Sequence, residues 1–503
     1  MKIIFFNMLF EMGTLGLLHV VTYLERNGYP AKHVYLTKTE DESEEEIKSI
    51  LAFIDQEQPD LIGFSLMTFN FFRTKRLTLE IKTRFPNIPV LWGGIHPTFN
   101  PEESIKYADY VCVGEGEDSV MALVKTLEGG HIKKDIPNIW MKQDDQVIKN
   151  GLRSLIQNLD DYPAPQINWD NTYCLDDGKI KLLTHNLYQK YVYYKGTMYD
   201  IMISRGCPYT CSYCANGLFK KIYAGKGKFL RYRSVDNAIA ELKAAKKTFP
   251  YLNMVNIQDD GFAAADEEYL KEFAYKYKRE IGLPLRLRII PTAINENKMK
   301  YLAEANTLVA VVGLQANDRV NKELFNRNTT AEQFLKVARL IKKYNIVGQY
   351  DLIIKNPFAN EQDEVEVCKI LAKIPKPFKL EIFALALFPN TPLRERAIKA
   401  GIKVNELDGY VTTYGNYPER FPHLRSIQMV SQYTPKFLMD LFISTRNSIW
   451  GRSLFKVYFH LIYQLIHKFR ASILKSTKLV RLTKMLIFFP QKVLGKRAVV
   501  AEI

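Results

Sequence analysis

The sequence has few cysteines, no long apolar run and no repeated segment. Only six of its 503 residues are cysteines, and three of these lie within eight residues, unlike a secreted disulfide framework. No run is apolar over the length that a bilayer crossing requires. The first residues have neither the basic segment nor the cleavage site of a signal peptide. We therefore expect a cytoplasmic protein whose clustered cysteines serve metal or redox chemistry.

The overall composition is that of a globular protein. With 47% hydrophobic and 25% charged residues, extensive disorder is not expected, and the length predicts two or three domains. The net charge of +16 is concentrated near the end of the chain, where residues 451–503 hold eleven Lys and Arg and one acidic residue, Glu502. This basic segment needs an explanation of its own.

Short apolar runs alternate with amphipathic stretches over the first part of the chain. Five runs rich in Ile, Val and Phe are predicted strands: Lys2–Phe6, His33–Leu36, Leu61–Leu66, Val90–Trp92 and Tyr110–Val113. Helical periodicity fills the intervening segments Leu15–Asn27, Glu44–Gln56, Phe71–Phe85 and Asp118–Glu128. This alternation is typical of an α/β fold with a Rossmann-like, doubly wound parallel sheet, in which ligands bind at the carboxyl ends of the strands.

A second alternating series begins near Asp200 and predicts a partial (β/α)6 barrel, again with chemistry at the strand ends. Its predicted strands are Ile201–Ser204, Met254–Gln258, Leu285–Ile290, Leu308–Gly313, Gly348–Ile354 and Phe378–Leu387. Ser234 is the expected N-cap of a helix between them. The predicted domains are a sheet domain (1–145), a hairpin and linker (146–195), a barrel (196–400) and a basic, mostly helical region (401–503).

Three cysteines with C-x3-C-x2-C spacing, Cys207, Cys211 and Cys214, follow directly on a predicted strand. Each thiolate can bind one corner of a four-iron four-sulfur cluster, which leaves the fourth iron without a protein ligand. An open iron can chelate a small molecule and deliver an electron to it. The alternative is a structural zinc site, which would need a fourth ligand such as Cys174 or His185.

The cysteine loop resembles the signature of the radical S-adenosylmethionine (SAM) superfamily, in which the open iron binds SAM. In that family the residue before the last cysteine, here Tyr213, packs near the adenine. Asp259 and Asp260 end the second predicted strand, where the family contacts the SAM amino group, although Asp260 also fits an Asp-Gly turn. After the fourth strand a segment resembles the family's GIESGS motif, with Gln315 for the usual Glu and Asn317 for Gly.

Small residues follow three of the predicted strands in the first domain, in an order that resembles the B12-binding domain of many radical SAM enzymes. Glycines there let the backbone approach a large planar ligand closely, and a serine hydroxyl can hydrogen-bond the nucleotide tail. The resemblance implies cobalamin contacts from Ser65, Gly93, Gly94, His96, Gly114, Glu115 and Gly116. For His96 the alternative is a turn residue beside Pro97.

One departure concerns the cobalt ligand. Cobalamin domains that supply a histidine to cobalt carry D-x-H-x-x-G after the first strand, whereas this sequence has no histidine between Asn7 and Gly13. We therefore expect cobalt without a histidine ligand from this motif, which would suit methyl transfer. His19 lies within an apolar helical pattern and is expected in the core or at its flank. A Rossmann-like domain that has lost cobalamin is the alternative.

The stretch from Trp450 to Phe489 mixes Leu, Ile, Phe and Tyr with widely spaced Lys and Arg. A basic amphipathic helix of this kind can lie in a membrane interface and attract anionic lipid, which would place the protein peripherally on the inner face of the membrane. The alternative is a helical region that packs its apolar stripe on the barrel. Nucleic-acid binding is not expected, because no recognised module accompanies the charge.

The resemblance spans about residues 1–400 and implies a cobalamin-dependent radical SAM enzyme. Its expected cofactors are a four-iron four-sulfur cluster, SAM and cobalamin, with a carrier such as flavodoxin or ferredoxin as electron donor. The implied reaction is methylation of an unactivated carbon in a small-molecule or lipid-like substrate. One alternative is a cyclase or rearrangement enzyme without methyl transfer, and another is a cobalamin- or cluster-binding sensor without turnover.

Overall fold

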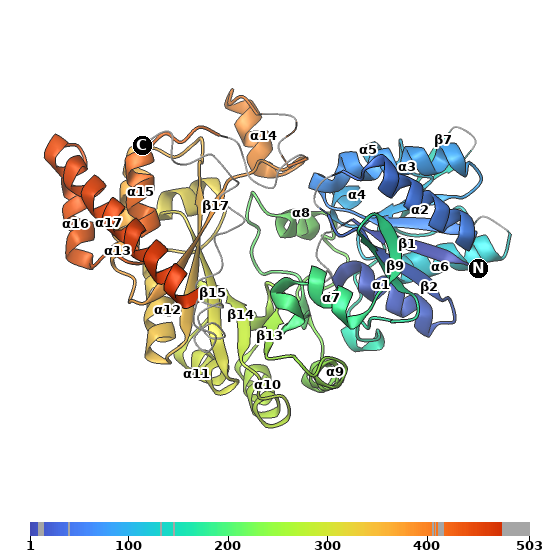
Figure 1. Cartoon of the computed structure of the whole chain (residues 1–503), viewed down its shortest axis with the longest axis horizontal. Coiled ribbons are helices and arrows are strands. Elements are labelled where there is room, and N and C mark those ends of the chain that lie inside the picture. Colours follow the sequence, from blue (N-terminus) through green and yellow to red (C-terminus); the bar gives the residue numbers. More distant parts are fainter. Residues whose placement is uncertain are drawn as a thin grey trace.

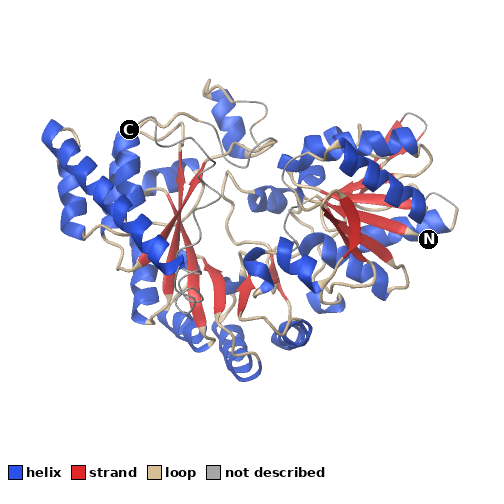
Figure 2. Cartoon of the chain, viewed as in Figure 1, coloured by secondary structure: helices blue, strands red, loops and turns tan. Residues whose placement is uncertain are grey.

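Two large β-sheets, each flanked by helices, occupy the two halves of the molecule (Figure 2), and a third sheet has only two strands. The computed structural model describes residues 1–8, 15–38, 41–130, 133–143, 146–404, 407, 409–410 and 417–474. The N-terminal sheet, the second sheet and a group of C-terminal helices follow one another along the longest axis (Figure 1). The predicted α/β class, with two sheets and a helical C-terminal region, is confirmed.

The N-terminal sheet has a parallel centre and an antiparallel hairpin at each edge, in the order β7-β6-β5-β4-β3-β1-β2-β8-β9. Because β1 lies between β2 and β3, the strand order reverses there, and doubly wound sheets bind ligands at such a switch point. The strands are β1 Ile3–Asn7, β2 Ala31–Tyr35, β3 Leu61–Ser65, β4 Val90–Gly93, β5 Tyr110–Cys112, β6 Ile139–Gln143, β7 Gln146–Lys149, β8 Thr172–Asp176 and β9 Lys179–Leu182.

Helices cover both faces of this sheet. The side chains of α1 (Leu15–Arg26) and α6 (Glu117–Glu128) share one apolar cluster with the strands, and those of α2 (Glu44–Glu57) and α3 (Phe71–Arg84) share the other. The short helices α4 (Ile95–Phe99) and α5 (Pro101–Ser104) follow β4. Strands buried on both faces are expected to be apolar throughout, and β1 is fully buried.

Residues 146–195 contribute more to the N-terminal sheet than the sequence predicts. Besides β7 they form β8 and β9, where we expect a linker, and then the helix α7 (His185–Tyr191). Strand β8 pairs in parallel with β2, with His33 opposite Thr172 and Tyr35 opposite Cys174. Because the two strands are far apart in the chain, no local pattern reveals their pairing.

The second sheet is an open barrel of six parallel strands in chain order, β10-β13-β14-β15-β16-β17, as predicted. The strands are β10 Met198–Ile201, β13 Met254–Ile257, β14 Leu285–Ile289, β15 Thr307–Gln315, β16 Val347–Ile354 and β17 Phe378–Ala384. The helices that alternate with them are α8 Ala215–Ile222, α9 Val235–Thr248, α10 Glu267–Glu280, α11 Glu296–Glu304, α12 Ala331–Lys343 and α13 Glu361–Ala372. Ser234 caps α9 as predicted, because its side chain accepts a hydrogen bond from the backbone N–H of Asn237.

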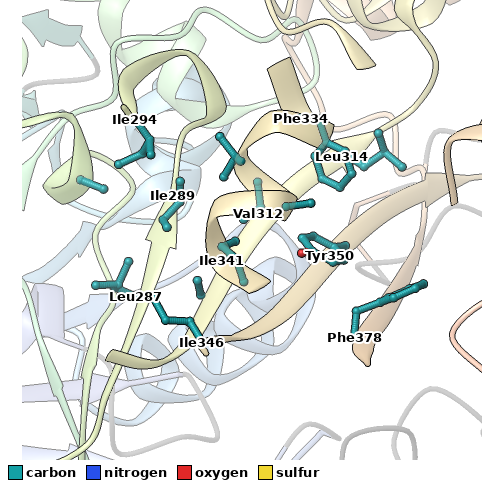
Figure 3. Packing of buried hydrophobic residues seen from close by; sticks show 14 of the residues in the cluster. Leu287, Ile289, Ile294, Val312, Leu314, Phe334, Ile341, Ile346, Tyr350 and Phe378 are labelled. Carbon is teal, nitrogen blue, oxygen red and sulfur yellow. The ribbon is translucent and has the colours of Figure 1, made fainter. Parts of the chain in front are cut away.

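Apolar side chains on one side of each barrel strand pack against the helices. Figure 3 shows Val312 and Leu314 of β15 close to Phe334 and Ile341 of α12, within one large buried cluster. Because successive strand residues point to opposite faces, the intervening positions face the inside of the barrel. The barrel therefore has an apolar outer layer, and its inner positions are available for polar chemistry.

The first barrel strand lies three residues earlier than predicted. We expect it at 201–204, whereas β10 ends at Ile201. Ile201 and Ile203 are buried in the same cluster, so the apolar alternation continues past the last paired residue. The next residues instead form β11 (Ser204–Arg205), which pairs antiparallel with β12 (Arg231–Tyr232) and encloses the cysteine loop.

The C-terminal region consists of α14 (Pro392–Lys399), α15 (Pro422–Val430), α16 (Lys436–Ser444) and α17 (Ile449–Leu474). Helices α15 and α16 pack on α13, and Phe455 of α17 meets Phe442 of α16 edge-on, with ring centroids 5.1 Å apart. None of the helices in the described part of the chain combines the length and apolar character needed to cross a bilayer. The sequence also predicts a hairpin around Asp144-Asp145. These two residues, most of the segment between Asn7 and Gly13, and the basic residues after Leu474 lie outside the described residues.

A buried ion pair fixes the edge of the N-terminal sheet where the loops after β1 and β2 begin. Arg73 donates from Nε to Glu42 at 2.8 Å and from Nη1 to the backbone carbonyls of Lys38 (2.7 Å) and Met8 (3.2 Å). Both side chains are 3% exposed. Loss of the guanidinium would leave the carboxylate of Glu42 buried without its partner, which is costly.

We predict that Arg73→Met lowers the free energy of unfolding of this sheet by about 3–5 kcal/mol in urea titrations. Lys149→Met is the matched control, because the Lys149–Glu102 pair has side chains 51% and 67% exposed. Removing that exposed pair should change the same quantity by about 0–1 kcal/mol. Equal losses in the two variants would contradict the role given to Arg73.

Candidate active site

The cysteine loop lines a cavity at the carboxyl end of the barrel. Cys207, Cys211 and Cys214 lie between β11 and α8, and all three contribute to the wall of a cavity of about 200 Å³. The remaining lining comes from the cysteine loop, α8 and four barrel strands or the turns after them: Tyr209, Tyr213, Asn216, Asp260, Arg288, Ile289, Ile290, Val311, Gly313, Gln315, Arg327 and Asp351. The three cysteines therefore share one chamber with polar groups from distant segments.

Cys207 and Cys211 of this loop are buried, and Cys214 is half-buried. Burial raises the pKa of Cys207 to about 11 and that of Cys214 to about 12. Because iron is bound by thiolates, loading a metal would release these protons. Arg327 places a positive charge beside these sulfurs, because its Nη1 atom lies 3.9 Å from the sulfur of Cys211. Its guanidinium carbon lies over the ring of Tyr209, 4.8 Å from the ring centroid.

The donor set fits a cluster with three protein ligands. Within the described residues, no three His, Cys, Asp or Glu side chains converge closely enough to bind a single metal ion. Three separate sulfurs around a common cavity are what the corners of a four-iron cube require. The fourth zinc ligands considered from the sequence lie elsewhere: Cys174 is in β8, and His185 stacks on Trp169 at 4.2 Å.

Three of the predicted SAM residues reach this cavity. The ring of Tyr213 lies edge-on to Phe325, with centroids 4.8 Å apart. Asp260 accepts a hydrogen bond from Asn216 Nδ2 at 2.8 Å and lies 3.9 Å from Arg288 Nε. Gln315 ends β15 with a φ of 63°, a left-handed conformation that is strained for a residue with a side chain.

Asp259 and Asn317, in contrast, do not line the cavity. Asp259 is buried and accepts hydrogen bonds from the backbone N–H groups of Ile203 (3.1 Å) and Ser204 (2.8 Å), and burial raises its pKa to about 6. Asn317 is 1% exposed and donates to Asp363 Oδ1 at 3.0 Å. Asp259 fixes the start of the cysteine loop, and Asn317 joins the turn after β15 to α13.

The cavity also contains charged residues that the sequence does not single out. Arg288 donates to the backbone carbonyl of Gln258 at 2.5 Å, and Asp351 on β16 accepts from Gln349 at 3.4 Å. Burial raises the pKa of Asp351 to about 6. Neither of these residues nor Arg327 belongs to the cysteine loop, and only the fold brings them beside it. The alternation of buried and less buried positions along β14 and β16 is the signal that could have identified Arg288 and Asp351 as inner positions.

A second cavity, of about 350 Å³, lies at the carboxyl edge of the N-terminal sheet. Its wall includes the predicted cobalamin residues Ser65, Gly93, Gly94, Gly114, Glu115 and Gly116. Apolar side chains from β1, β3, β4, α1 and α6 line it as well: Phe5, Leu17, Val20, Phe64, Leu91 and Val120. His96 lies outside it, buried between Phe71 and Tyr410. The cavity sits at the β1/β3 switch point, where a doubly wound sheet is expected to bind a ligand.

Two glycines allow neighbouring segments to approach each other closely in the wall of this second cavity. At Gly94, with φ +99°, a Cβ would lie 2.8 Å from the carbonyl oxygen of Leu66. At Gly114 a Cβ would lie 1.8 Å from the hydroxyl oxygen of Tyr223, which caps the C-terminus of α8. A side chain at either position would therefore clash, so the loops need glycine for their conformation and approach.

Ion pairs join the wall of this cavity to the hairpin that carries the cysteine loop. Arg231 donates two hydrogen bonds, of 2.7 and 3.1 Å, to the carboxylate of Glu115, and Arg205 donates one of 2.6 Å to Glu117. Arg205 lies two residues before Cys207. Asn216 lines both cavities, so they adjoin at this side chain.

Comparison with known proteins gives a match for each half. Residues 1–124 match the family model of the B12 binding domain, and residues 201–371 match that of the radical SAM superfamily. An uncharacterized methyltransferase of Pyrococcus horikoshii is 26% identical over 78% of this chain and 80% of its own length. The anaerobic magnesium-protoporphyrin IX monomethyl ester cyclase of Rubrivivax gelatinosus is 23% identical over 78% of this chain, which spans 66% of the cyclase.

A solved structure shares the arrangement of both halves. The radical SAM methyltransferase TsrM from Kitasatospora setae, solved with cobalamin and a four-iron four-sulfur cluster, superimposes with a TM-score of 0.64. The match covers 80% of this chain and 76% of TsrM at 17% identity. At this identity the likeness concerns the fold.

We predict that Cys211→Ala, purified without oxygen, loses most of its iron and its brown colour, because the cluster would lose one of its three protein ligands. Cys174→Ala is the control, since Cys174 is equally buried but lies in the N-terminal sheet. Iron analysis and visible spectra measure the difference. Full iron content in Cys211→Ala would contradict the assignment.

Proposed function

Because this chain is a cobalamin-dependent radical SAM enzyme, we propose that it transfers a methyl group to an unactivated carbon of its substrate. Its cofactors are a four-iron four-sulfur cluster, SAM and cobalamin, which supply the electron for SAM cleavage and the methyl carrier when bound. The observation that carries the proposal is the side-by-side placement of the two cavities, with Asn216 in the wall of both.

The residues of the chain have positioning roles in this proposal. Cys207, Cys211 and Cys214 hold the cluster, and Tyr213, Asp260 and Gln315 contact SAM from the other walls of the same cavity. Asp260 is suited to the SAM ammonium group, because a carboxylate and an ammonium form a charge-assisted hydrogen bond.

The cavity in the N-terminal domain is proposed to take the nucleotide tail of cobalamin. A volume of about 350 Å³ is at the small end for ligand pockets and suits part of a large cofactor rather than all of it. The backbone around Gly93 and Gly114 would then contact the cofactor on the side of the cavity that faces the barrel. Ser65 would offer a hydroxyl to the tail.

Methyl transfer is favoured over cyclisation by the breadth of the likeness. The uncharacterized methyltransferase of Pyrococcus horikoshii is matched over 80% of its length and the cyclase of Rubrivivax gelatinosus over 66%, while each match covers 78% of this chain. Ring closure without methyl transfer is the second candidate, since a cyclase is also among the relatives. In either case we expect an external electron carrier such as flavodoxin or ferredoxin, and a small-molecule or lipid-like substrate.

SAM labelled with deuterium in its methyl group separates the two candidates. We predict that the reduced enzyme, given this SAM and a metabolite extract, forms 5′-deoxyadenosine together with a product that carries the labelled methyl group. Mass spectrometry detects both. Formation of 5′-deoxyadenosine with an unlabelled product would favour the cyclase, and absence of 5′-deoxyadenosine would reject both candidates.

We further propose that α17 contacts an anionic membrane surface. One face of the helix packs on the protein through Gly451, Phe455 and Phe459. Another face exposes an apolar row, which we call the outer stripe: Trp450 (59% exposed), Leu454 (43%), Val457 (60%), Leu461 (55%) and Leu465 (62%). The outer stripe follows the helical repeat, and the exposed Arg452 and Lys456 lie on the same helix. A helix that combines an exposed apolar stripe with basic residues elsewhere on its exposed surface is suited to an anionic lipid surface.

Vesicle co-sedimentation tests this surface. We predict that the full chain sediments with vesicles containing phosphatidylglycerol but not with pure phosphatidylcholine vesicles. Leu461→Asp should weaken binding roughly tenfold or more, because it removes apolar burial worth about 1.5–3 kcal/mol. Tyr275→Asp is the control, since Tyr275 is an apolar residue of α10 that is 64% exposed. Retained binding of Leu461→Asp, or self-association through the stripe in place of lipid binding, would contradict the proposal.

A further inference from the structure

The cavity in the N-terminal domain contains one buried group that the proposed function leaves unexplained. His19 on α1 is 8% exposed and contributes to the wall of that cavity. Its Nε2 atom is buried and has no hydrogen-bond partner among the described residues. A buried polar atom without a partner costs about 1–3 kcal/mol, and the neighbouring wall positions of the same helix, Leu17 and Val20, are apolar.

The surroundings keep this imidazole neutral. Burial lowers the pKa of His19 well below its usual value, and the nearby guanidinium groups of Arg205 and Arg233 lower it further. A neutral imidazole is a weak partner for an anion such as a phosphate. It offers one N–H donor and one ring-nitrogen acceptor, which suits a neutral, planar heterocycle.

Burial alone does not distinguish His19, because His33 on β2 is also buried without partners on either ring nitrogen. His33 stacks on Tyr35 with ring centroids 4.2 Å apart and lies outside the cavity wall. The difference is that the side chain of His19, whose Nε2 atom has no partner, contributes to the wall of a cavity lined by Phe5, Phe64 and Leu91. Such a chamber accepts a flat apolar ring and provides one hydrogen bond to it.

We propose that His19 Nε2 hydrogen-bonds the ring nitrogen of the dimethylbenzimidazole base of cobalamin and thereby selects the cofactor that carries its nucleotide tail. This inference rests on the proposed function, because it assumes that cobalamin occupies the site. A base held in this cavity, away from the corrin, would leave its ring nitrogen free to accept a hydrogen bond from His19. The hydrogen bond would satisfy both the base and the histidine.

Cobalamin and cobinamide, which lacks the nucleotide tail, separate the tail contact from corrin binding. We expect the full wild-type chain to bind cobalamin more tightly than cobinamide in visible-absorption titrations. His19→Leu should weaken cobalamin binding about ten- to a hundredfold, because the base nitrogen is then buried without a partner, and leave cobinamide binding within about twofold. His33→Leu is the control and should leave both affinities unchanged.

A second variant covers the case in which His19→Leu does not fold. His19→Gln keeps a donor on a polar side chain and should retain a preference for cobalamin over cobinamide between those of the wild type and the leucine variant. Equal affinity of the wild type for the two ligands, or an equal effect of His19→Leu on both, would overturn the inference. If the wild type binds neither ligand, the proposed function itself fails, which is a distinguishable result.

Discussion

The arrangement of the active site depends on the ion pairs between the segment after β5, which contains Gly114 and Gly116, and the β11–β12 hairpin that carries the cysteines. Arg231 and Arg205 bind Glu115 and Glu117, and the side chains of Arg231 and Glu117 are each 4% exposed. Buried ion pairs add little net stability, because desolvation of the charges offsets their attraction, but breaking one is costly. Their value here is geometric, since they fix one cofactor cavity relative to the other.

This constraint explains why residues of one half belong to the cavity of the other. The hydroxyl oxygen of Tyr223 accepts a hydrogen bond from the backbone N–H of Glu115 at 3.0 Å, beside Gly114. Asn216, which lines both cavities, lies two residues after Cys214 and donates to Asp260. The wall between the cavities is thus built from the cysteine segment itself. Radical chemistry benefits from such rigidity, because the reacting groups must be held close together and water must be excluded from them.

Local sequence patterns were sufficient for much of the fold and for part of the site. The cysteine spacing, the glycines after the strands and the alternation of strands and helices are all local, and they identified both halves. Arg288, Arg327 and Asp351 were missed because each lies on a different segment and only the barrel brings them together. Asp259 and Asn317 have the expected chemistry, but hydrogen bonds to Ser204 and Asp363 turn them away from the cavity. The pairing of β8 with β2 is long-range and has no local signal.

The central claim is that one chain holds an iron–sulfur cluster and cobalamin in adjoining cavities. Parallel iron and cobalt analysis of the wild-type protein, reconstituted without oxygen and freed of unbound cofactor, tests it most directly. We expect about four iron ions and one cobalt ion per chain. Protein that retains iron but releases all cobalt, or that retains neither, would contradict it.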